Sequence, residues 1–192
     1  ELWRAAGLPA GVVELVIAPG RAVGEHVVPD LRIQAVMFTG STETGSWIAR
    51  KLAERGGEPV PLIAETGGQN CMIVDSTALP EQVVDDVVSS GFQSAGQRCS
   101  ALRVLFLQED VADKIITMIK GAMMELHIGD PAHLSTDVGP VIDQKALTGL
   151  NNHVEYLTGK GTLHYACQAP TGEGHFFFAP RLYEIKDLSV LQ

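Results

Sequence analysis

Segments with the pattern of a buried strand alternate with segments that have the pattern of an amphipathic helix along most of this 192-residue chain. Runs rich in β-branched and apolar residues predict strands at residues 12–17, 35–38, 61–65, 71–74, 102–107, 162–166 and 176–185. Apolar residues at helical spacing predict helices at residues 22–28, 44–54, 80–93, 111–126 and 144–157. A loop at 129–140 and a glycine-rich turn at 171–174 interrupt the later segments. This alternation predicts an α/β fold with mostly parallel sheets.

Composition excludes several classes of protein. The net charge of −9 argues against a nucleic-acid partner, because a polyanion is bound by clustered Lys and Arg. The longest apolar runs, such as residues 104–107, are far shorter than the ~20 residues of a membrane span. The three cysteines suggest neither a disulfide framework nor a metal spacing, and the six histidines show no ligand-like spacing. We therefore expect free thiols, a cytoplasmic location and no metal.

The first candidate site is the glycine turn at residues 38–45. It follows a predicted strand and precedes a predicted helix, where N–H groups and the helix dipole favour a phosphate. Glycine at position 40 permits close approach of a ligand, and the Ser41 hydroxyl can donate a further hydrogen bond. The same residues also fit an ordinary strand-to-helix turn with a serine cap, and short glycine motifs often match by chance.

The second candidate is Glu65, which ends an apolar strand and is followed by Gly67 and Gly68. A carboxylate in apolar surroundings has a raised pKa, which makes it a usable general base near neutral pH. The two glycines leave room for a cofactor or a substrate. A carboxylate that only caps a turn is the alternative, and the residues alone favour it.

The third candidate is Cys99, which follows a helix and a glycine break and stands next to Arg98. A neighbouring positive charge can lower the pKa of a thiol and produce a nucleophile. A structural cysteine fits these residues equally well. Cys71 and Cys167 lie in strand-like stretches, and we expect both to be small core residues.

These three sites occur together and in an order that resembles the aldehyde dehydrogenase superfamily. The shared motifs are Gly40-Ser41-x-x-x-Gly45, Glu65-x-Gly67-Gly68 and Gly96-Gln97-x-Cys99. The longer motifs at residues 65–70, 94–103 and 137–143 are similar to the glutamate-semialdehyde branch. Within that branch they resemble most the dehydrogenase module of the bifunctional flavoproteins called proline utilization A. The similarity extends over nearly the whole chain.

The resemblance implies an NAD-dependent oxidation of L-glutamate γ-semialdehyde to glutamate through a thiohemiacetal and a thioester on the cysteine. It assigns roles by motif: Cys99 as nucleophile, Glu65 as general base, Gly40, Ser41 and Gly45 at the pyrophosphate, Thr39 and Gly67 near the nicotinamide, and Ser100 at the substrate carboxylate. FAD is expected only in a separate proline dehydrogenase domain of the parent protein. The choice between NAD and NADP stays open.

The resemblance also implies that the chain is a fragment. Residues 1–66 would be part of an NAD-binding domain and residues 67–192 part of a catalytic domain. The family's oxyanion asparagine, its ribose-binding lysine and its Glu-x-Phe-Gly-Pro segment are missing, so we expect little activity from the chain alone. Exposed sheet edges would favour a homo-oligomer. Three alternatives remain: a dehydrogenase for another aldehyde, a non-catalytic binding or oligomerisation module, and, less favoured, a cysteine hydrolase.

Overall fold

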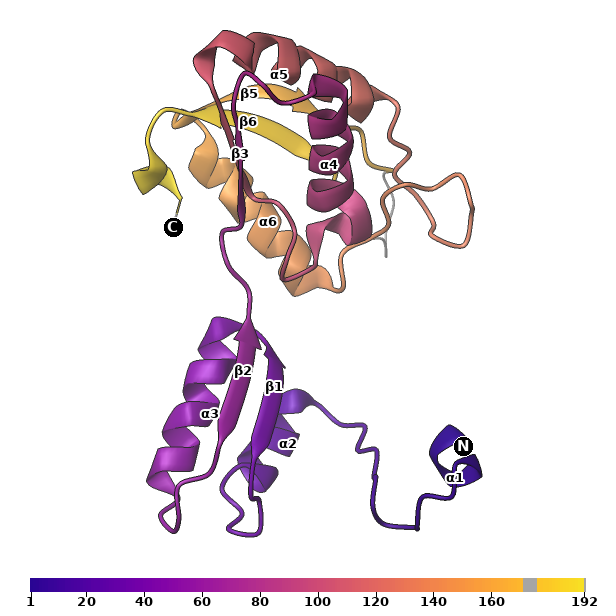
Figure 1. Ribbon diagram of the computed structural model, residues 1–192, viewed down its shortest axis with the longest axis vertical. Coiled ribbons are helices and arrows are strands. Elements are labelled where there is room, and N and C mark those ends of the chain that lie inside the picture. The colour runs from indigo at the N-terminus through magenta and orange to yellow at the C-terminus, as the bar shows by residue number, and fades with distance from the viewer. Residues whose placement is uncertain (171–175, 192) are drawn as a thin grey trace. The chain divides into compact units, whose positions relative to one another are not determined.

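The computed structural model describes residues 1–170 and 176–191, so the expected turn at residues 171–174 lies outside the described residues. The chain divides into two compact units, Glu1–Gly67 and Gly68–Gln192, called unit 1 and unit 2 below (Figure 1). Among the described strands, two pairs are parallel and one is antiparallel. The predicted α/β fold with mostly parallel sheets is confirmed.

Unit 1 is built around one β-α-β crossover. Its elements are α1 (Leu2–Ala5), α2 (Gly20–Val27), β1 (Val36–Gly40), α3 (Thr42–Glu54) and β2 (Leu62–Thr66). β1 and β2 are parallel, with Val36 paired to Leu62 at one end and Gly40 to Thr66 at the other. Parallel neighbours need a crossover connection, which α3 provides. The strands predicted at residues 35–38 and 61–65 and the helices predicted at 22–28 and 44–54 are confirmed, with small shifts at their ends.

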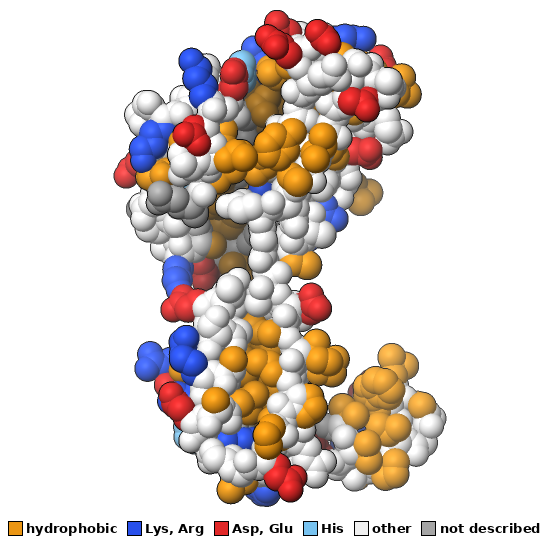
Figure 2. Space-filling view, turned by 60° about the vertical axis from the view of Figure 1, so that its left-hand side comes forward, with side chains coloured by type: hydrophobic (Ala, Val, Ile, Leu, Met, Phe, Trp, Pro, Cys, Tyr) orange, Lys and Arg blue, Asp and Glu red, His pale blue; other side chains and the backbone are white. Residues whose placement is uncertain are grey.

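One face of the β1–β2 sheet is covered by α3 and the other face is open. A Cβ added to Gly45 of α3 would lie 3.3 Å from Thr66 Cγ2 and 3.6 Å from Ala64 Cβ, so even-numbered strand residues face the helix. Odd-numbered residues face away. Met37 and Ile63 are register partners on that open face and are 80% and 51% exposed. Apolar side chains reach the surface of both units in Figure 2.

The strand predicted at residues 12–17 is wrong, because the structure has no strand there. The apolar side chains of this segment are 55% to 88% exposed, namely Val12, Val13, Leu15, Val16 and Ile17. A β-branched run becomes a strand only when a neighbour accepts its hydrogen bonds and covers one of its faces. Within the described part of unit 1, this segment lacks such a neighbour.

The described residues of unit 2 form two strand pairs and three long helices. Its elements are β3 (Cys71–Val74), α4 (Pro80–Phe92), the 3₁₀ turn η1 (Gln93–Gly96), β4 (Val104–Leu107), α5 (Glu109–Met124), α6 (Gln144–Leu157), β5 (Gly161–Ala166), β6 (Arg181–Ile185) and the 3₁₀ turn η2 (Leu188–Val190). β3 and β4 are parallel, with Cys71 paired to Val104. β5 and β6 are antiparallel. None of the helices in the described residues combines the length and the apolar composition that a membrane-spanning helix needs.

The core of unit 2 lies between α4, α5 and the strands. From α4 it takes Val83, Val84 and Val87, and from α5 it takes Ile115, Ile119 and Met123, all of them buried. Burial of each such side chain contributes about 1.5–3 kcal/mol relative to exposure. This core fixes the end of α4 and the start of β4. The loop between them, which carries Cys99, is therefore held at both ends.

The last strand is shorter than the predicted segment 176–185, since β6 begins at Arg181. Pro180 precedes it and has no N–H group to contribute to a ladder. The carbonyl of Pro180 accepts a hydrogen bond from the Cys167 N–H at 2.9 Å, and the carbonyl of Phe176 accepts one from the Val141 N–H at 2.8 Å. These isolated hydrogen bonds do not form a ladder, so residues 176–180 have an irregular conformation.

Candidate active site

The glycine turn at residues 38–45 lies at a strand-to-helix junction, as predicted. Ser41 is the N-cap of α3. Its hydroxyl accepts a hydrogen bond from the Thr44 N–H at 3.2 Å and donates one to Thr44 Oγ1 at 2.9 Å, so Ser41 does cap the helix. The N–H groups of Thr42 and Glu43 precede the first intrahelical bond, which joins the Gly45 N–H to the Ser41 carbonyl. Such groups have no acceptor inside the helix and can bind a phosphate.

Glu65 lies beside Thr39 at the carboxyl end of the two parallel strands. These two residues are register partners, as are Gly40 and Thr66 one position later. Both Glu65 and Thr39 are odd-numbered, so their side chains lie on the open face of the sheet. Glu65 is exposed, and unit 1 by itself does not provide the apolar surroundings that the sequence suggested. The structure thus brings the unit 1 candidates together at one end of one sheet.

The two remaining glycines of the predicted cofactor site differ in their surroundings. Gly45 is buried, and the absence of a side chain lets α3 begin close to β2. Gly67 is exposed, and a Cβ added there would meet nothing within 4 Å. Packing among the described residues therefore explains the glycine at 45. At position 67, packing within unit 1 gives no reason for a glycine.

Cys99 lies at the corner of an exposed turn in unit 2, between α4 and β4. The N–H of Ala101 donates to the carbonyl of Arg98 at 3.1 Å, so Cys99 and Ser100 are the two central residues of the turn. Both central residues are exposed, whereas Ala101 is fully buried. The turn is thus anchored by a buried residue and carries the thiol and the hydroxyl at the surface.

The backbone just before this turn is strained. Ser94, Ala95 and Gly96 have φ angles of 55°, 53° and 66°. The left-handed region costs a residue with a Cβ about 1–2 kcal/mol. Conformations of this kind persist only where the surroundings hold them, and they cluster at functional sites. Side chains of the neighbouring residues Gln97 and Arg103 hold this segment.

The side chains of Gln97 and Arg103 bond two different carbonyl groups of the strained segment. Gln97 donates through Nε2 to the Ser94 carbonyl at 3.0 Å and accepts through Oε1 from the Ile142 N–H at 2.8 Å. Arg103 donates through Nη2 to the Gly96 carbonyl at 2.7 Å. These bonds tie the segment to the loop before α6 and to the start of β4.

Arg98 does not have the surroundings that the sequence suggested. Its Nη2 donates to the carbonyls of Ser89 and Ser90 at 2.9 Å and 3.3 Å, near the end of α4. The sequence placed this positive charge next to the thiol of Cys99. In the structure the guanidinium instead stabilises carbonyl groups at the end of α4. Such carbonyl groups have no N–H partner inside the helix.

Asn70 was not singled out by the sequence, yet it contacts the Cys99 turn directly. Its Nδ2 donates to the carbonyl of Cys99 at 2.6 Å and to that of Ala101 at 3.0 Å. The signal that could have identified it is its position directly before the strand at residues 71–74. Since β3 and β4 are parallel, the start of β3 lies beside the end of the Cys99 loop.

The other two cysteines have opposite environments. Cys167 is buried, as predicted, and its thiol donates to the Met123 carbonyl at 3.3 Å. Burial raises the pKa of the Cys167 thiol above its usual value. Cys71 is exposed, so its prediction as a core residue is wrong. It lies on the same side of β3 as Ile73, which is 80% exposed.

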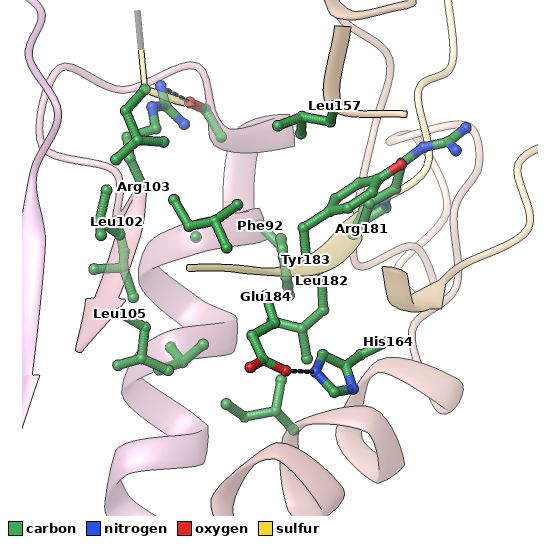
Figure 3. Close-up of a pocket in the computed structure, with 18 of the residues that line it drawn as sticks. Phe92, Leu102, Arg103, Leu105, Leu157, His164, Arg181, Leu182, Tyr183 and Glu184 are labelled. Atoms are coloured by element: carbon green, nitrogen blue, oxygen red, sulfur yellow. Dashed lines mark hydrogen bonds and ion pairs between the residues drawn. The ribbon is translucent and has the colours of Figure 1, made fainter. Parts of the chain in front are cut away.

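Unit 2 also contains a cavity of about 580 Å³ between β4 and β6 (Figure 3). Every residue of these two strands lines it, and on its wall His164 Nε2 lies 2.9 Å from Glu184 Oε2. The lining includes Gly96 and Arg103 but neither Cys99 nor Ser100. The cavity therefore adjoins the base of the Cys99 loop and not the turn that carries the thiol.

Gly96→Ala is expected to destabilise unit 2. At a φ of +66°, the new Cβ would lie 2.9 Å from the Gly91 carbonyl oxygen and 3.1 Å from Arg103 Nη1. Relief of this crowding would break the bond from Arg103 to the Gly96 carbonyl. Strain and a lost hydrogen bond together lower the free energy of unfolding by about 2–3 kcal/mol, measured by urea denaturation with circular dichroism.

Gly121→Ala in α5 is the matched control, because a Cβ at Gly121 would meet nothing within 4 Å. Helix propensity predicts that this variant gains up to about 1 kcal/mol. If the two variants were equally stable, the left-handed conformation at Gly96 and its bond from Arg103 would not contribute to the stability of unit 2.

Comparison with known proteins places these observations in a family. The model of the aldehyde dehydrogenase family matches residues 1–188. The bifunctional protein PutA of Escherichia coli is 47% identical over 97% of this chain, which spans 15% of that protein. The 1-pyrroline-5-carboxylate dehydrogenase of Geobacillus kaustophilus is 33% identical over 95% of the chain, which spans 36% of its length.

A solved structure gives the same result. A mutant of proline utilization A from Bradyrhizobium japonicum superimposes with a TM-score of 0.93 at 50% identity, over 99% of this chain and 19% of that one. The chain thus spans only a small part of the relatives that it matches. The predicted resemblance, including that to bifunctional proline utilization A, is confirmed. Because the family match covers almost its full length, this chain belongs to the aldehyde dehydrogenase family.

Proposed function

We propose that this chain carries the nucleophile and the general base of an NAD-dependent dehydrogenase that oxidises L-glutamate γ-semialdehyde to glutamate in proline catabolism. The Cys99 turn is the observation that carries the proposal: an exposed thiol on a turn anchored by buried Ala101 and bonded by Asn70. The name of the Geobacillus kaustophilus relative supports the substrate, because 1-pyrroline-5-carboxylate hydrolyses to this semialdehyde.

In the proposed mechanism, the Cys99 thiolate adds to the aldehyde carbon and forms a thiohemiacetal. Oxidation converts it into a thioester. Glu65 takes a proton from a water molecule, which attacks the thioester carbon, and the carbon–sulfur bond breaks to release the acid and the thiol. Ser100 follows the nucleophile directly, and its hydroxyl would donate a hydrogen bond to the carboxylate of the substrate.

NAD would supply the acceptor for the hydride that the oxidation releases. Thr39, Gly40 and Ser41 would hold it at the start of α3, with Gly45 allowing that helix to lie close to β2. The N–H groups of the first turn and the free space at Gly67 fit this role. The negative charge of Glu43 in the same turn repels an anion and so disfavours phosphate binding close to that side chain. In the proposed arrangement, the backbone of Gly40 and Ser41 would therefore hold the pyrophosphate, and Glu43 would not contribute to its binding.

We also propose a cytoplasmic location and self-association. Cys71, Cys99 and Cys167 are free thiols, which fits a reducing compartment. Met37 and Ile63 expose apolar surface on the open face of the β1–β2 sheet, which would favour contact with a further protein surface.

A chimera tests the function. Residues 1–192 would replace the segment that they match in the Escherichia coli relative. With NAD, we expect the chimera to oxidise glutamate semialdehyde in preference to propanal, and we expect almost no turnover from the chain alone. A folded chimera that prefers propanal would contradict the proposed substrate. A folded chimera that forms no NADH with either aldehyde would contradict the function itself.

The three cysteines of the chain are expected to react with iodoacetamide at different rates near neutral pH. Cys99 should react fastest and the exposed Cys71 more slowly. Cys167 should be slowest, because burial shields it and its raised pKa leaves less thiolate until the pH rises. Mass spectrometry of the peptides gives the three rates. In urea they should converge, and a native order with Cys71 ahead of Cys99 would count against an activated thiol.

A further inference from the structure

We infer that Asn70 is a positioning residue that fixes the orientation of the Cys99–Ser100 peptide through its side-chain amide. This inference rests on the proposed role of Cys99 as the nucleophile. The amide offers two N–H donors, and its nitrogen lies 2.6 Å from the Cys99 carbonyl oxygen and 3.0 Å from the Ala101 carbonyl oxygen. Asn70 therefore contacts both the central peptide of the turn and the residue at its buried end.

The hydrogen bond that closes this turn does not fix the orientation of its central peptide, which joins Cys99 to Ser100. The bond from the Ala101 N–H to the Arg98 carbonyl holds the two ends of the turn. Type I and type II turns share that bond and differ by a flip of the central peptide. A flip would exchange the positions of the Cys99 carbonyl and the Ser100 N–H. The 2.6 Å bond from Asn70 holds the carbonyl on one side and so selects one orientation.

Asn70 can do this because its own backbone is fixed. Its carbonyl accepts hydrogen bonds from the N–H groups of Arg103 and Val104 at 2.9 Å and 3.1 Å, where the β3–β4 ladder begins. The side chain therefore starts from a rigid sheet and ends on an exposed loop. A catalytic group on a loop needs such support, since small errors in its position are costly in rate.

The other side chains on this loop act at different places. Gln97 and Arg103 bond the carbonyls of Ser94 and Gly96, which precede the turn. Arg98 is bonded to the end of α4. Asn70 instead donates to the carbonyl of the proposed nucleophile itself. Removal of its amide should thus release the turn and leave the strained segment before it in place.

The test uses the full chain with Asn70→Ala and, as a matched control, Asn152→Ala in α6, where the asparagine is exposed. The first measurement is trypsin cleavage after Arg98, which reports how often the turn opens. We expect Asn70→Ala to raise that rate about tenfold, and Asn152→Ala to change it less than about twofold. Cleavage after Lys120 in α5 serves as the internal reference for general loosening.

The second measurement is the iodoacetamide rate of Cys99 across pH, with N-acetylcysteine as the reference for an unstructured thiol. In the unchanged chain Cys99 should react faster than this reference. In Asn70→Ala its rate should approach the reference at every pH, while the rate of Cys71, the next residue along the chain, should stay unchanged. A merely structural defect at the start of β3 would instead alter Cys71 as well.

The outcomes separate the two hypotheses. If Asn70→Ala changes neither the cleavage after Arg98 nor the reactivity of Cys99, Asn70 does not position the turn. If both cysteines change by the same factor, the residue is structural and the inference is again wrong. If cleavage rises as expected but Cys99 reacts like N-acetylcysteine even in the unchanged chain, Asn70 does hold the turn and the proposed nucleophile is wrong.

Discussion

Cys99→Ala is expected to abolish NADH formation from glutamate semialdehyde in the chimera, with a fall in kcat on the order of 10⁴-fold or more. Alanine has no atom that can bond to the aldehyde carbon, so neither the thiohemiacetal nor the thioester can form. The change should leave the fold intact, because Cys99 is exposed and the hydrogen bond from Asn70 goes to its backbone carbonyl, which alanine keeps. The effect should therefore appear in kcat, while the affinity for NAD, measured by calorimetry, stays the same.

Cys71→Ala is the control for this variant. Cys71 is also an exposed free thiol of unit 2, but it begins β3 and lies on the side that faces away from the core. We expect its kcat to stay within about twofold of the unchanged chimera. Substantial NADH formation by a homogeneous Cys99→Ala protein would exclude covalent catalysis by this cysteine.

The fold was predictable where it depends on local patterns. The segments 35–38, 44–54 and 61–65 each have a clear strand or helix period, and a parallel pair joined by a helix follows from their order. Residues 12–17 have an equally clear strand pattern but form no strand, because pairing depends on a neighbour that the pattern does not describe. Local periodicity thus identifies an element only when its partner is also present.

The unit 1 part of the site was predictable for the same reason. The carboxyl ends of neighbouring parallel strands meet at one edge, so Thr39 and Glu65 are expected at the same edge once both strands are recognised. The observed register then pairs the two residues directly. The capping role of Ser41 was one of two interpretations that the sequence left open, and the bond from the Thr44 N–H confirms it. The role of that turn in binding NAD stays a prediction.

The support of the Cys99 turn could not be predicted. Ser94 and Ala95 adopt a left-handed conformation that their residue types disfavour, so no propensity indicates it. Asn70 reaches Cys99 across 29 positions of the chain, and Gln97 reaches Ile142 across 45. Such bonds depend on how the β3–β4 pair and the loop before α6 are placed around the turn, and on side-chain geometry. Neither is expressed in a local sequence pattern.

Glu65→Gln is expected to separate the two halves of the proposed reaction in the chimera. Glutamine keeps the shape of the side chain, but it cannot take a proton from water. Oxidation of the thiohemiacetal should still proceed, so rapid mixing should show a burst of about one NADH per active site. The steady-state rate after the burst should fall by about 10²–10⁴-fold, the usual contribution of a general base.

Glu58→Gln is the matched control, since Glu58 is an exposed carboxylate of the same unit, outside β2. It should leave both phases unchanged. The burst is the decisive observation, because it distinguishes two roles for Glu65. A base that only activates water acts after NADH has formed, so its loss spares the burst. A base that deprotonates Cys99 acts before, so its loss would slow the burst itself. A slow burst in Glu65→Gln, with Glu58→Gln normal, would therefore move Glu65 from the hydrolysis step to the activation of the thiol.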